Sequence, residues 1–315
     1  MNFASLVDWI KKIEELGYPW TLQKNPKGVS RCLLSSSSLF CKLAKIYSNH
    51  FTADKERLRD TILSFSREDG MLEDIPGDNK AITQLNIVSE TRQSFSGLIN
   101  LGFEVPKFDC SSFFKEPLYF MKDSEWRNPW GAGAHLSHYL FFMTRSGQPD
   151  KVDEVLKNLE RFEQPEGWYY KTCPDPHTLV NGVMKVMTAF DAANVPISKK
   201  NIKGILEFVF SYTNVHGGCG IYDLVYILDR CIDFGVRVNE CEDLLHLCYK
   251  EILSHQQADG GFSFSRNCCQ TLYYLKKISD PYPCGDIHGT TLFSMALVRI
   301  DNRLKLGLNL CPAVT

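Results

Sequence analysis

The chain has 315 residues, of which 44% are hydrophobic and 23% charged, and its net charge is −2 at pH 7. This length accommodates one large or two ordinary domains with a sizeable core, and the lack of a basic surplus argues against nucleic acid as a partner. No apolar run reaches the roughly 18 residues that a membrane-spanning helix needs, so we expect no membrane span.

The first predicted element, residues 2–16, is an amphipathic helix, because its apolar residues recur at helical spacing among charged ones. This pattern favours a helix of the folded protein over a signal peptide. The 12 cysteines are scattered along the chain. We therefore expect free buried thiols and a reducing, cytoplasmic compartment. Cys268, Cys269, Cys284 and His288 form a local cluster of metal-binding side chain types, but they lack the Cys-x-x-Cys spacing of strong zinc motifs, which favours structural thiols.

Apolar periodicity predicts helices almost throughout the chain, and they come in pairs. The paired ranges are 2–16 with 31–47, 55–66 with 85–101, 111–121 with 132–143, 152–162 with 179–192, 202–212 with 222–234, and 244–253 with 292–304. Connectors that contain glycine or proline join the two helices of a pair. The sequence thus predicts an all-α protein of six helical hairpins.

Several connectors share a turn in which glycine precedes a large apolar residue. The clearest copy is Gln257-Ala258-Asp259-Gly260-Gly261-Phe262, and weaker copies are Glu68-Asp69-Gly70-Met71 and Glu166-Gly167-Trp168. Glycine supplies the positive φ of a tight turn, and the apolar residue can fold back over the helix ends. Repeats spaced by roughly 50 residues indicate stacked units, none of which buries its apolar face alone.

Two features favour a closed ring over an open stack of hairpins. The second helix of a pair is the more apolar one, so that 132–143 reads as buried on most sides whereas 152–162 is amphipathic. In addition, neither terminal pair has an obviously polar capping face. We therefore predict that residues 1–315 form a single closed α/α toroid with an inner and an outer ring of helices.

The turn at residues 257–262 and its copies resemble the repeat of squalene cyclases and protein prenyltransferase β subunits. In prenyltransferases, an Asp-x-Cys-Tyr sequence at the start of one inner helix and a histidine at the next hold a catalytic zinc. Asp223 and His288 match the Asp and His, whereas Val225 stands at the cysteine position and cannot bind zinc. Cys219 is a candidate replacement ligand. The acid motif Asp-x-Asp-Asp of squalene cyclases is absent.

If the second helices form an inner ring, their first turns point to one mouth of the barrel, where a small-molecule substrate would bind. These turns bring Glu90, Arg92, Gln93, His135, His138, His177, Asn181, Asp223, Asp286 and His288. We predict that the catalytic groups are Asp223, His288, His177 and His135. The predicted substrate-binding residues are His138, Arg92, Asn181, Trp130, Trp168, Tyr169 and Phe262.

Simpler roles compete with these predictions. Asp223 and Asp286 can be helix N-caps, and Phe262 and the tryptophans can be core residues or turn plugs. Arg92 can pair with Glu90 or Asp74 instead of a substrate.

The resemblance implies a terpenoid-type enzyme, a cyclase or prenyltransferase, in which aromatic faces stabilise carbocations and an acid protonates an alkene. An alternative is a carbohydrate-active enzyme of similar six-hairpin architecture, a glycoside hydrolase or polysaccharide lyase. The second alternative is a non-catalytic toroid that binds a protein. Zinc is the only cofactor that the resemblance suggests, and Val225 argues against it.

Overall fold

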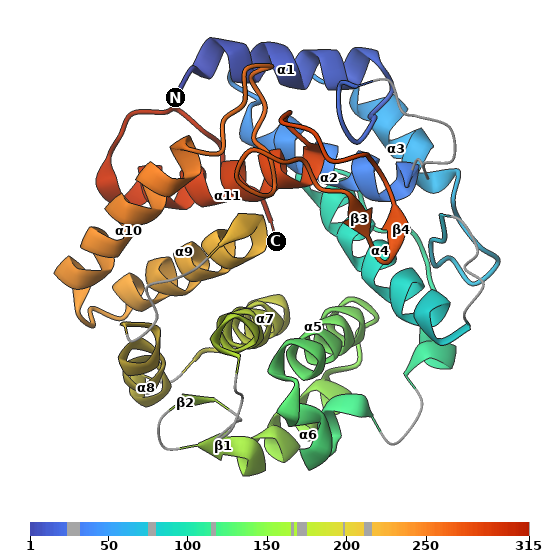
Figure 1. Ribbon diagram of the computed structural model, residues 1–315. Helices are drawn as coiled ribbons and strands as arrows, with labels where there is room; N and C mark the ends of the chain where they lie inside the picture. The colour runs from blue at the N-terminus through green and yellow to red at the C-terminus, as the bar shows by residue number, and fades with distance from the viewer. Residues whose placement is uncertain are drawn as a thin grey trace. The chain divides into compact units, whose positions relative to one another are not determined.

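The computed structural model describes residues 1–23, 32–74, 80–114, 118–164, 167–168, 175–197, 199–210 and 216–314. Over these residues the chain is mainly helical, with helices α1 to α11, short 3-10 turns and two short antiparallel hairpins (Figure 1). The all-α class is confirmed. The chain divides into two compact units, Met1–Asp109 with His216–Tyr222 and His246–Thr315, and Cys110–Val215 with Asp223–Leu245.

The first unit is built around α2. Its elements are α1 (Phe3–Glu15), α2 (Leu33–Ile46), α3 (Lys55–Leu63), α4 (Lys80–Leu101), the hairpin of β3 (Leu272–Tyr273) and β4 (Lys276–Lys277), and α11 (Ile287–Leu304). Helix α2 packs against α3, α4 and α11. Its four consecutive serines, at 35–38, are all buried, and the side chains of Ser35, Ser36 and Ser38 form hydrogen bonds to neighbouring segments. The serines thereby let polar side chains from other elements approach the centre of this unit.

The second unit is built around two helices that lie side by side, α5 (Pro129–Arg145) and α7 (Pro176–Ala193) (Figure 1). Around them are η1 (Ser111–Phe113), η2 (Tyr119–Met121), η3 (Asp123–Arg127), α6 (Pro149–Leu159), η4 (Glu160–Phe162), the hairpin of β1 (Glu163–Gln164) and β2 (Gly167–Trp168), and α8 (Lys199–Phe210). Helices α9 (Gly217–Asp233) and α10 (Val238–Leu253) contribute residues to both units.

Most predicted helices are confirmed, and two predictions are wrong. Residues 111–121 were expected to form a helix, but the described part of this stretch holds only the 3-10 turns η1 and η2. Residues 217–220 were expected to form a turn, yet they are the first turn of α9. The sequence Gly-Gly-Cys-Gly has low helix propensity, and packing overrides it because Gly218 is buried against Phe264 and Leu292.

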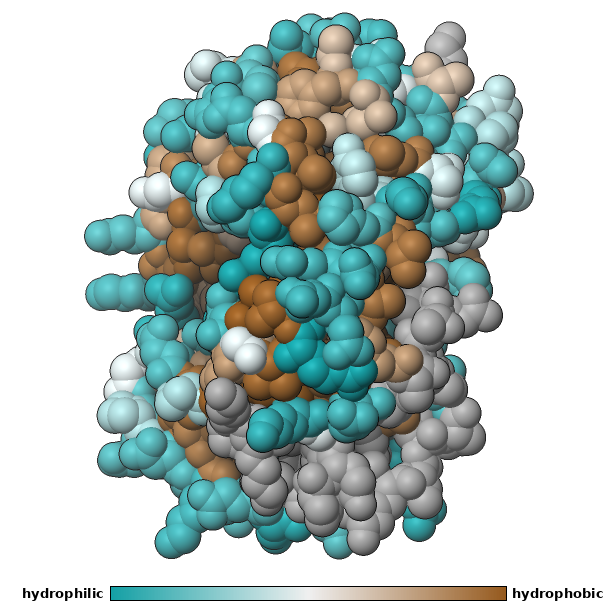
Figure 2. Space-filling model, turned by 90° about the vertical axis from the view of Figure 1, so that its left-hand side faces the viewer, coloured by the Kyte–Doolittle hydropathy of each residue, from teal (hydrophilic) through white to brown (hydrophobic). Residues whose placement is uncertain are grey.

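The expected difference between the two helices of a hairpin is confirmed in the burial of their side chains. Helix α3 buries only Leu58 and Ile62, and α6 buries one stripe of three apolar residues. In contrast, α2, α5 and α11 are buried around most of their circumference. On the face that Figure 2 shows, hydrophilic residues lie between groups of apolar ones.

The turn after α10 docks onto α1, which explains its glycine. Gly260 has a φ of +102°, and a Cβ there would lie 2.2 Å from the carbonyl oxygen of Ser5. Asp259 closes the turn by accepting hydrogen bonds from the amides of Gly261 (3.2 Å) and Gly285 (3.1 Å), and it accepts a further one from Trp9 Nε1 (3.2 Å). One carboxylate thus holds the turn, α1 and the segment before α11 together.

A second copy of this turn follows α3 with matching contacts. The amide of Leu72 donates to Thr91 Oγ1 of α4 (2.8 Å), as the amide of Phe262 donates to Thr290 Oγ1 of α11 (3.0 Å). Gly70 has a φ of +74° and also lies against backbone, since a Cβ there would be 2.2 Å from a carbonyl oxygen. Both copies of the repeated turn in the first unit therefore share the same hydrogen bond, from a turn amide to a threonine hydroxyl of the following helix.

No helix among the described residues is long and apolar enough to cross a membrane.

We predict that Gly260→Ala lowers the free energy of unfolding by about 3 kcal/mol, because it adds a clash with backbone to the cost of a positive φ. The matched control is Gly102→Ala, where φ is +92° but no atom lies within 4 Å of the added Cβ. That control should cost only about 1 kcal/mol. Urea unfolding followed by circular dichroism measures both, and equal costs would contradict the role of docking.

Candidate functional site

Asp286, the N-cap of α11, fixes the backbone around the first polar cluster. Its buried carboxylate accepts hydrogen bonds from the amides of Phe264 (2.7 Å), Gln270 (3.0 Å) and Gly289 (2.7 Å). Burial raises the pKa of Asp286 to about 7, and the three amides oppose this by stabilising the charged form. Asp286 is thus the helix cap that the sequence offered as an alternative, and it also joins two loop positions to α11.

His288 projects from the first turn of α11 into a group of aromatic rings. The Nδ1 atom lies 2.8 Å from Oε1 of Gln270, and because Oε1 only accepts, Nδ1 is the protonated nitrogen. The ring of Phe264 stacks on the imidazole at 5.2 Å, while Tyr273 and Trp20 approach it edge to face at 5.5 and 6.4 Å. Gln270 and the three rings therefore determine the orientation of His288.

Two tyrosines of the β3–β4 hairpin connect His288 to α4. Tyr274 shares a hydrogen bond with Ser89, and Tyr273 forms side-chain hydrogen bonds with Gln93 and Tyr274. Burial raises the pKa of both tyrosines, so both hydroxyls keep their protons at neutral pH. The cluster thus extends from α11 through the hairpin to the polar residues that the sequence had singled out on α4.

Glu90 adds a buried carboxyl group to this cluster. It accepts a hydrogen bond from Ser35 Oγ of α2 (2.8 Å). Burial is the main cause that raises the pKa of Glu90, nearby Asp74 raises it further, and Lys276 of the hairpin opposes both. The pKa of Asp74 is raised as well, again mainly by burial. Two carboxyl groups and one amine therefore meet where α4 and the hairpin approach each other.

Asp223 is an acid of the second unit whose pKa is strongly raised. Its side chain is buried, and its Oδ2 atom has no hydrogen-bond partner among the described residues. Burial raises the pKa of Asp223 to about 8, against the lowering effect of Lys185 on α7. The carboxyl is consequently mostly neutral at pH 7 and able to donate a proton. The alternative that Asp223 is an N-cap is wrong, because α9 begins at Gly217.

The predicted histidines of α5 lie close together. The rings of His135 and His138 have centroids 6.4 Å apart, and Tyr119 of η2 lies 4.4 Å from His135. Burial lowers the pKa of His135, and Glu125 only partly offsets this. His135 is therefore neutral at pH 7 and suited to accept a proton.

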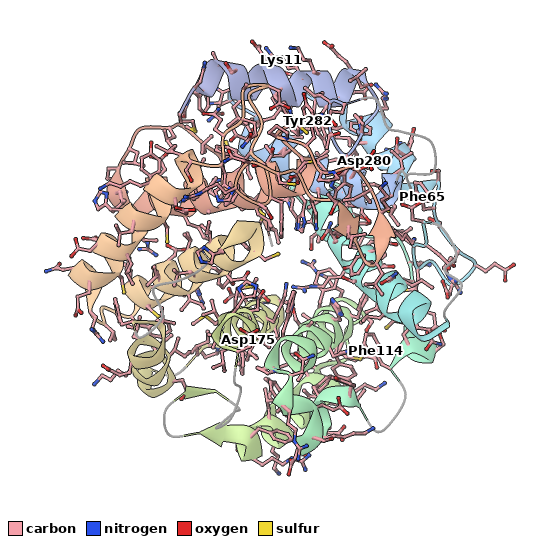
Figure 3. All side chains as sticks on the ribbon, in the orientation of Figure 1. Lys11, Phe65, Phe114, Asp175, Asp280 and Tyr282 are labelled. Atoms are coloured by element: carbon pink, nitrogen blue, oxygen red, sulfur yellow. The ribbon has the colours of Figure 1, made fainter. Side chains whose placement is uncertain are left out.

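The start of α7 brings a third histidine to the same helix pair. The ring of Trp130, at the start of α5, stands perpendicular to that of His177 at 6.2 Å. Asn181 Nδ2 donates to the carbonyl oxygen of His177 (3.0 Å), which holds the amide on the same side of α7. Asp175 caps α7 and is labelled in Figure 3. Trp130 is 41% exposed, so this end of the helix pair is open to solvent.

Three further residues that were predicted to bind substrate are Phe262, Trp168 and Tyr169. Phe262 is fully buried and packs on Phe293, as expected of a turn plug. Tyr169 and the side chain of Trp168 lie outside the described residues. Asp223 and His288 belong to different units, so their joint action stays a prediction.

The residues of the suggested zinc site do not fit a metal. Val225 is fully buried and offers no donor atom, and Asp223 holds its proton at neutral pH. Over the described ranges, no group of three or more His, Cys, Asp or Glu residues is arranged to bind an ion. Neither Cys219 with His288 nor Cys268, Cys269 and Cys284 with His288 forms such a group.

Sequence reasoning missed the hairpin residues of the first cluster. Gln270, Tyr273 and Tyr274 lie between the repeated turn and α11, in a stretch that the helical pattern treats as a connector. The signal was the length of that connector, because the 24 residues between Phe262 and the start of α11 at Ile287 are far more than a turn needs. The strand-forming Tyr273-Tyr274 pair within it was the second signal.

Comparisons with models of protein families, with curated proteins and with solved structures find no match to this chain.

We predict that Asp286→Asn lowers the free energy of unfolding by about 3 kcal/mol, because the Nδ2 group replaces an acceptor and leaves buried amides without a partner. The matched control is Asp175→Asn, an exposed N-cap that accepts from the amides of His177 and Thr178. It should cost less than about 1 kcal/mol. Urea unfolding compares the two variants, and similar small losses would show that Asp286 does not organise the loop.

Proposed function

We propose that this protein is a terpenoid-type enzyme in which the neutral carboxylic acid of Asp223 protonates an alkene. The observation that carries the proposal is the state of that acid: it is buried, its Oδ2 atom is without a hydrogen-bond partner among the described residues, and its pKa is raised to about 8. Protonation of a carbon–carbon double bond requires an acid that still holds its proton at neutral pH. An ordinary surface aspartate would have lost it.

The surroundings of Asp223 support the role of an acid. Val225, Tyr226 and Leu224, its neighbours on α9, are all buried, so water is kept from the carboxyl group. Exclusion of water favours the neutral acid and protects a carbocation from capture by hydroxide or water. Lys185 lies close enough to lower the pKa of Asp223, and it would stabilise the carboxylate that remains after proton transfer.

One further group of the same unit, His135, is suited to this chemistry. His135 is neutral at pH 7 because burial lowers its pKa, so it can accept the proton that ends a carbocation sequence. In this proposal Asp223 starts the reaction and a neutral histidine ends it.

The proposal includes the fold that the sequence predicts, a single closed α/α toroid of six hairpins. The repeated turn of the first unit and the burial of α2, α5 and α11, the second helices of three hairpins, support it.

We predict that the purified protein converts acyclic polyprenyl substrates to cyclic products, which gas chromatography with mass spectrometry detects. Polyprenyl diphosphates and uncharged polyprenes are both to be offered. Asp223→Asn should lower turnover by roughly 100-fold or more, because the amide cannot donate the proton, while the fold persists since Asn resembles the neutral acid. Asp233→Asn, on an exposed position of the same helix, is the matched control and should keep full activity.

The stability of the Asp223→Asn variant provides an independent control. Because the folded pKa of Asp223 is raised from 3.8 to about 8, the wild-type protein loses stability as pH rises through that interval. The variant should lack this contribution and should be at least as stable as wild type at pH 8. Full cyclase activity in the variant, or turnover of unsaturated glycosides instead of polyprenes, would overturn the proposal.

A further inference from the structure

Cys269 and Cys284 are held side by side by one carbonyl group. The backbone amides of both residues donate to the carbonyl oxygen of Tyr282, each at 2.9 Å. Tyr282 and its neighbour Asp280 are labelled in Figure 3, in the stretch that leads into α11. Two cysteines that are distant in sequence therefore have neighbouring backbones, and this fixes the separation of their side chains.

The two thiols also contact each other. The thiol of Cys284 forms a side-chain hydrogen bond to the sulfur of Cys269, and both cysteines are buried and in the reduced state. Cys269 Sγ also lies 3.3 Å from Ser279 Oγ, and the Cys269 thiol donates to the carbonyl oxygen of Asp280 (3.3 Å). A disulfide bond requires the two sulfurs to approach to about 2 Å, and the shared carbonyl group and the contact between the thiols already hold them as neighbours.

Their chemistry is asymmetric in the way that thiol oxidation requires. The hydrogen bond from Cys284 lowers the pKa of Cys269, whereas the pKa of Cys284 is raised by the same bond and by burial. Cys269 is therefore the thiol of the pair that ionises first and attacks as the thiolate. By contrast, burial alone raises the pKa of Cys41, an isolated thiol of α2, which makes it unreactive.

We propose that Cys269 and Cys284 are a redox modification site, which closes to an intramolecular disulfide when a low-molecular-weight disulfide such as oxidised glutathione reacts with it. This inference goes beyond the proposed function and does not depend on it. Tyr282, whose carbonyl joins the two cysteines, has a relative exposure of 53%, so a local opening of its segment admits a small oxidant.

The reaction balances in two exchange steps. The Cys269 thiolate attacks one sulfur of oxidised glutathione, forms a mixed disulfide and releases one glutathione thiolate, which takes a proton. The Cys284 sulfur, after losing its proton, attacks Cys269 Sγ and releases the second glutathione thiol. Two protein thiols are oxidised to one disulfide, and one glutathione disulfide is reduced to two thiols.

The bond would act on the first polar cluster. The segment between the two cysteines carries Gln270, which orients His288, and the tyrosines Tyr273 and Tyr274. A disulfide would tie the two ends of this segment and limit the motion of the hairpin. The oxidation state of the pair would thus set how freely the side chains around His288 can move.

The test treats the reduced, full-length protein with oxidised glutathione near neutral pH, blocks remaining thiols with iodoacetamide and maps tryptic peptides by mass spectrometry without reduction. Cleavage after Arg266, Lys276, Lys277 and Arg299 places Cys269 on peptide 267–276 and Cys284 on peptide 278–299. We expect these two peptides as one cross-linked species, which dithiothreitol separates.

Peptide 267–276 contains Cys268 as well as Cys269, so variants are needed to show which of the two forms the disulfide. The cross-linked species should persist in Cys268→Ser and disappear in Cys269→Ser. Circular dichroism of each variant confirms that it is folded. The proposal is overturned if folded wild-type protein gives no cross-linked peptides, or if the species is lost in Cys268→Ser and kept in Cys269→Ser.

Discussion

The first unit depends on one buried carboxylate whose oxygens accept hydrogen bonds from the backbone. This carboxylate, Asp286, accepts from three amides, one from α11 itself and two from the long segment that precedes it. The amide of Gln270 is one of the three, and its side chain orients His288. The need to solvate the buried carboxylate of Asp286 therefore positions Gln270, and through its side chain the imidazole of His288.

Asp223 is also a buried acid, but its surroundings differ from those of Asp286. Asp286 is surrounded by amide donors, whereas the Oδ2 atom of Asp223 has no donor among the described residues. Burial raises the pKa of both aspartates; three backbone hydrogen bonds oppose this at Asp286, whereas the charge of Lys185 opposes it at Asp223. A buried acid without donors costs stability, and proteins retain such groups where a neutral acid is useful. This contrast separates the structural aspartate from the candidate catalytic one.

Much of the helical framework was predictable from the sequence, because amphipathic periodicity reports which face of a helix is buried. The turn at Gly260 was predictable too, since only glycine fits a positive φ against the backbone of Ser5. The start of α9 was missed because its packing outweighs the low helix propensity of its glycines. The hairpin residues Tyr273 and Tyr274 were missed because their partners lie on α4, and no local pattern encodes a contact such as that of Tyr274 with Ser89, 185 residues away in sequence. Histidines at helix starts were singled out from the sequence, and their roles stay predictions; the lowered pKa of His135 depends on burial that only the fold defines.

The titration of the Asp223 carboxyl group is the most direct test of whether this residue is a neutral acid at neutral pH. Carbon-13 NMR of protein labelled at aspartate carboxyl groups, with Asp223→Asn to assign the resonance, follows this titration. We expect the carboxyl group to stay protonated at pH 7 and to titrate at about pH 8. A resonance that titrates near the ordinary aspartate pKa of about 4 would show that Asp223 is ionised at neutral pH and cannot be the proton donor.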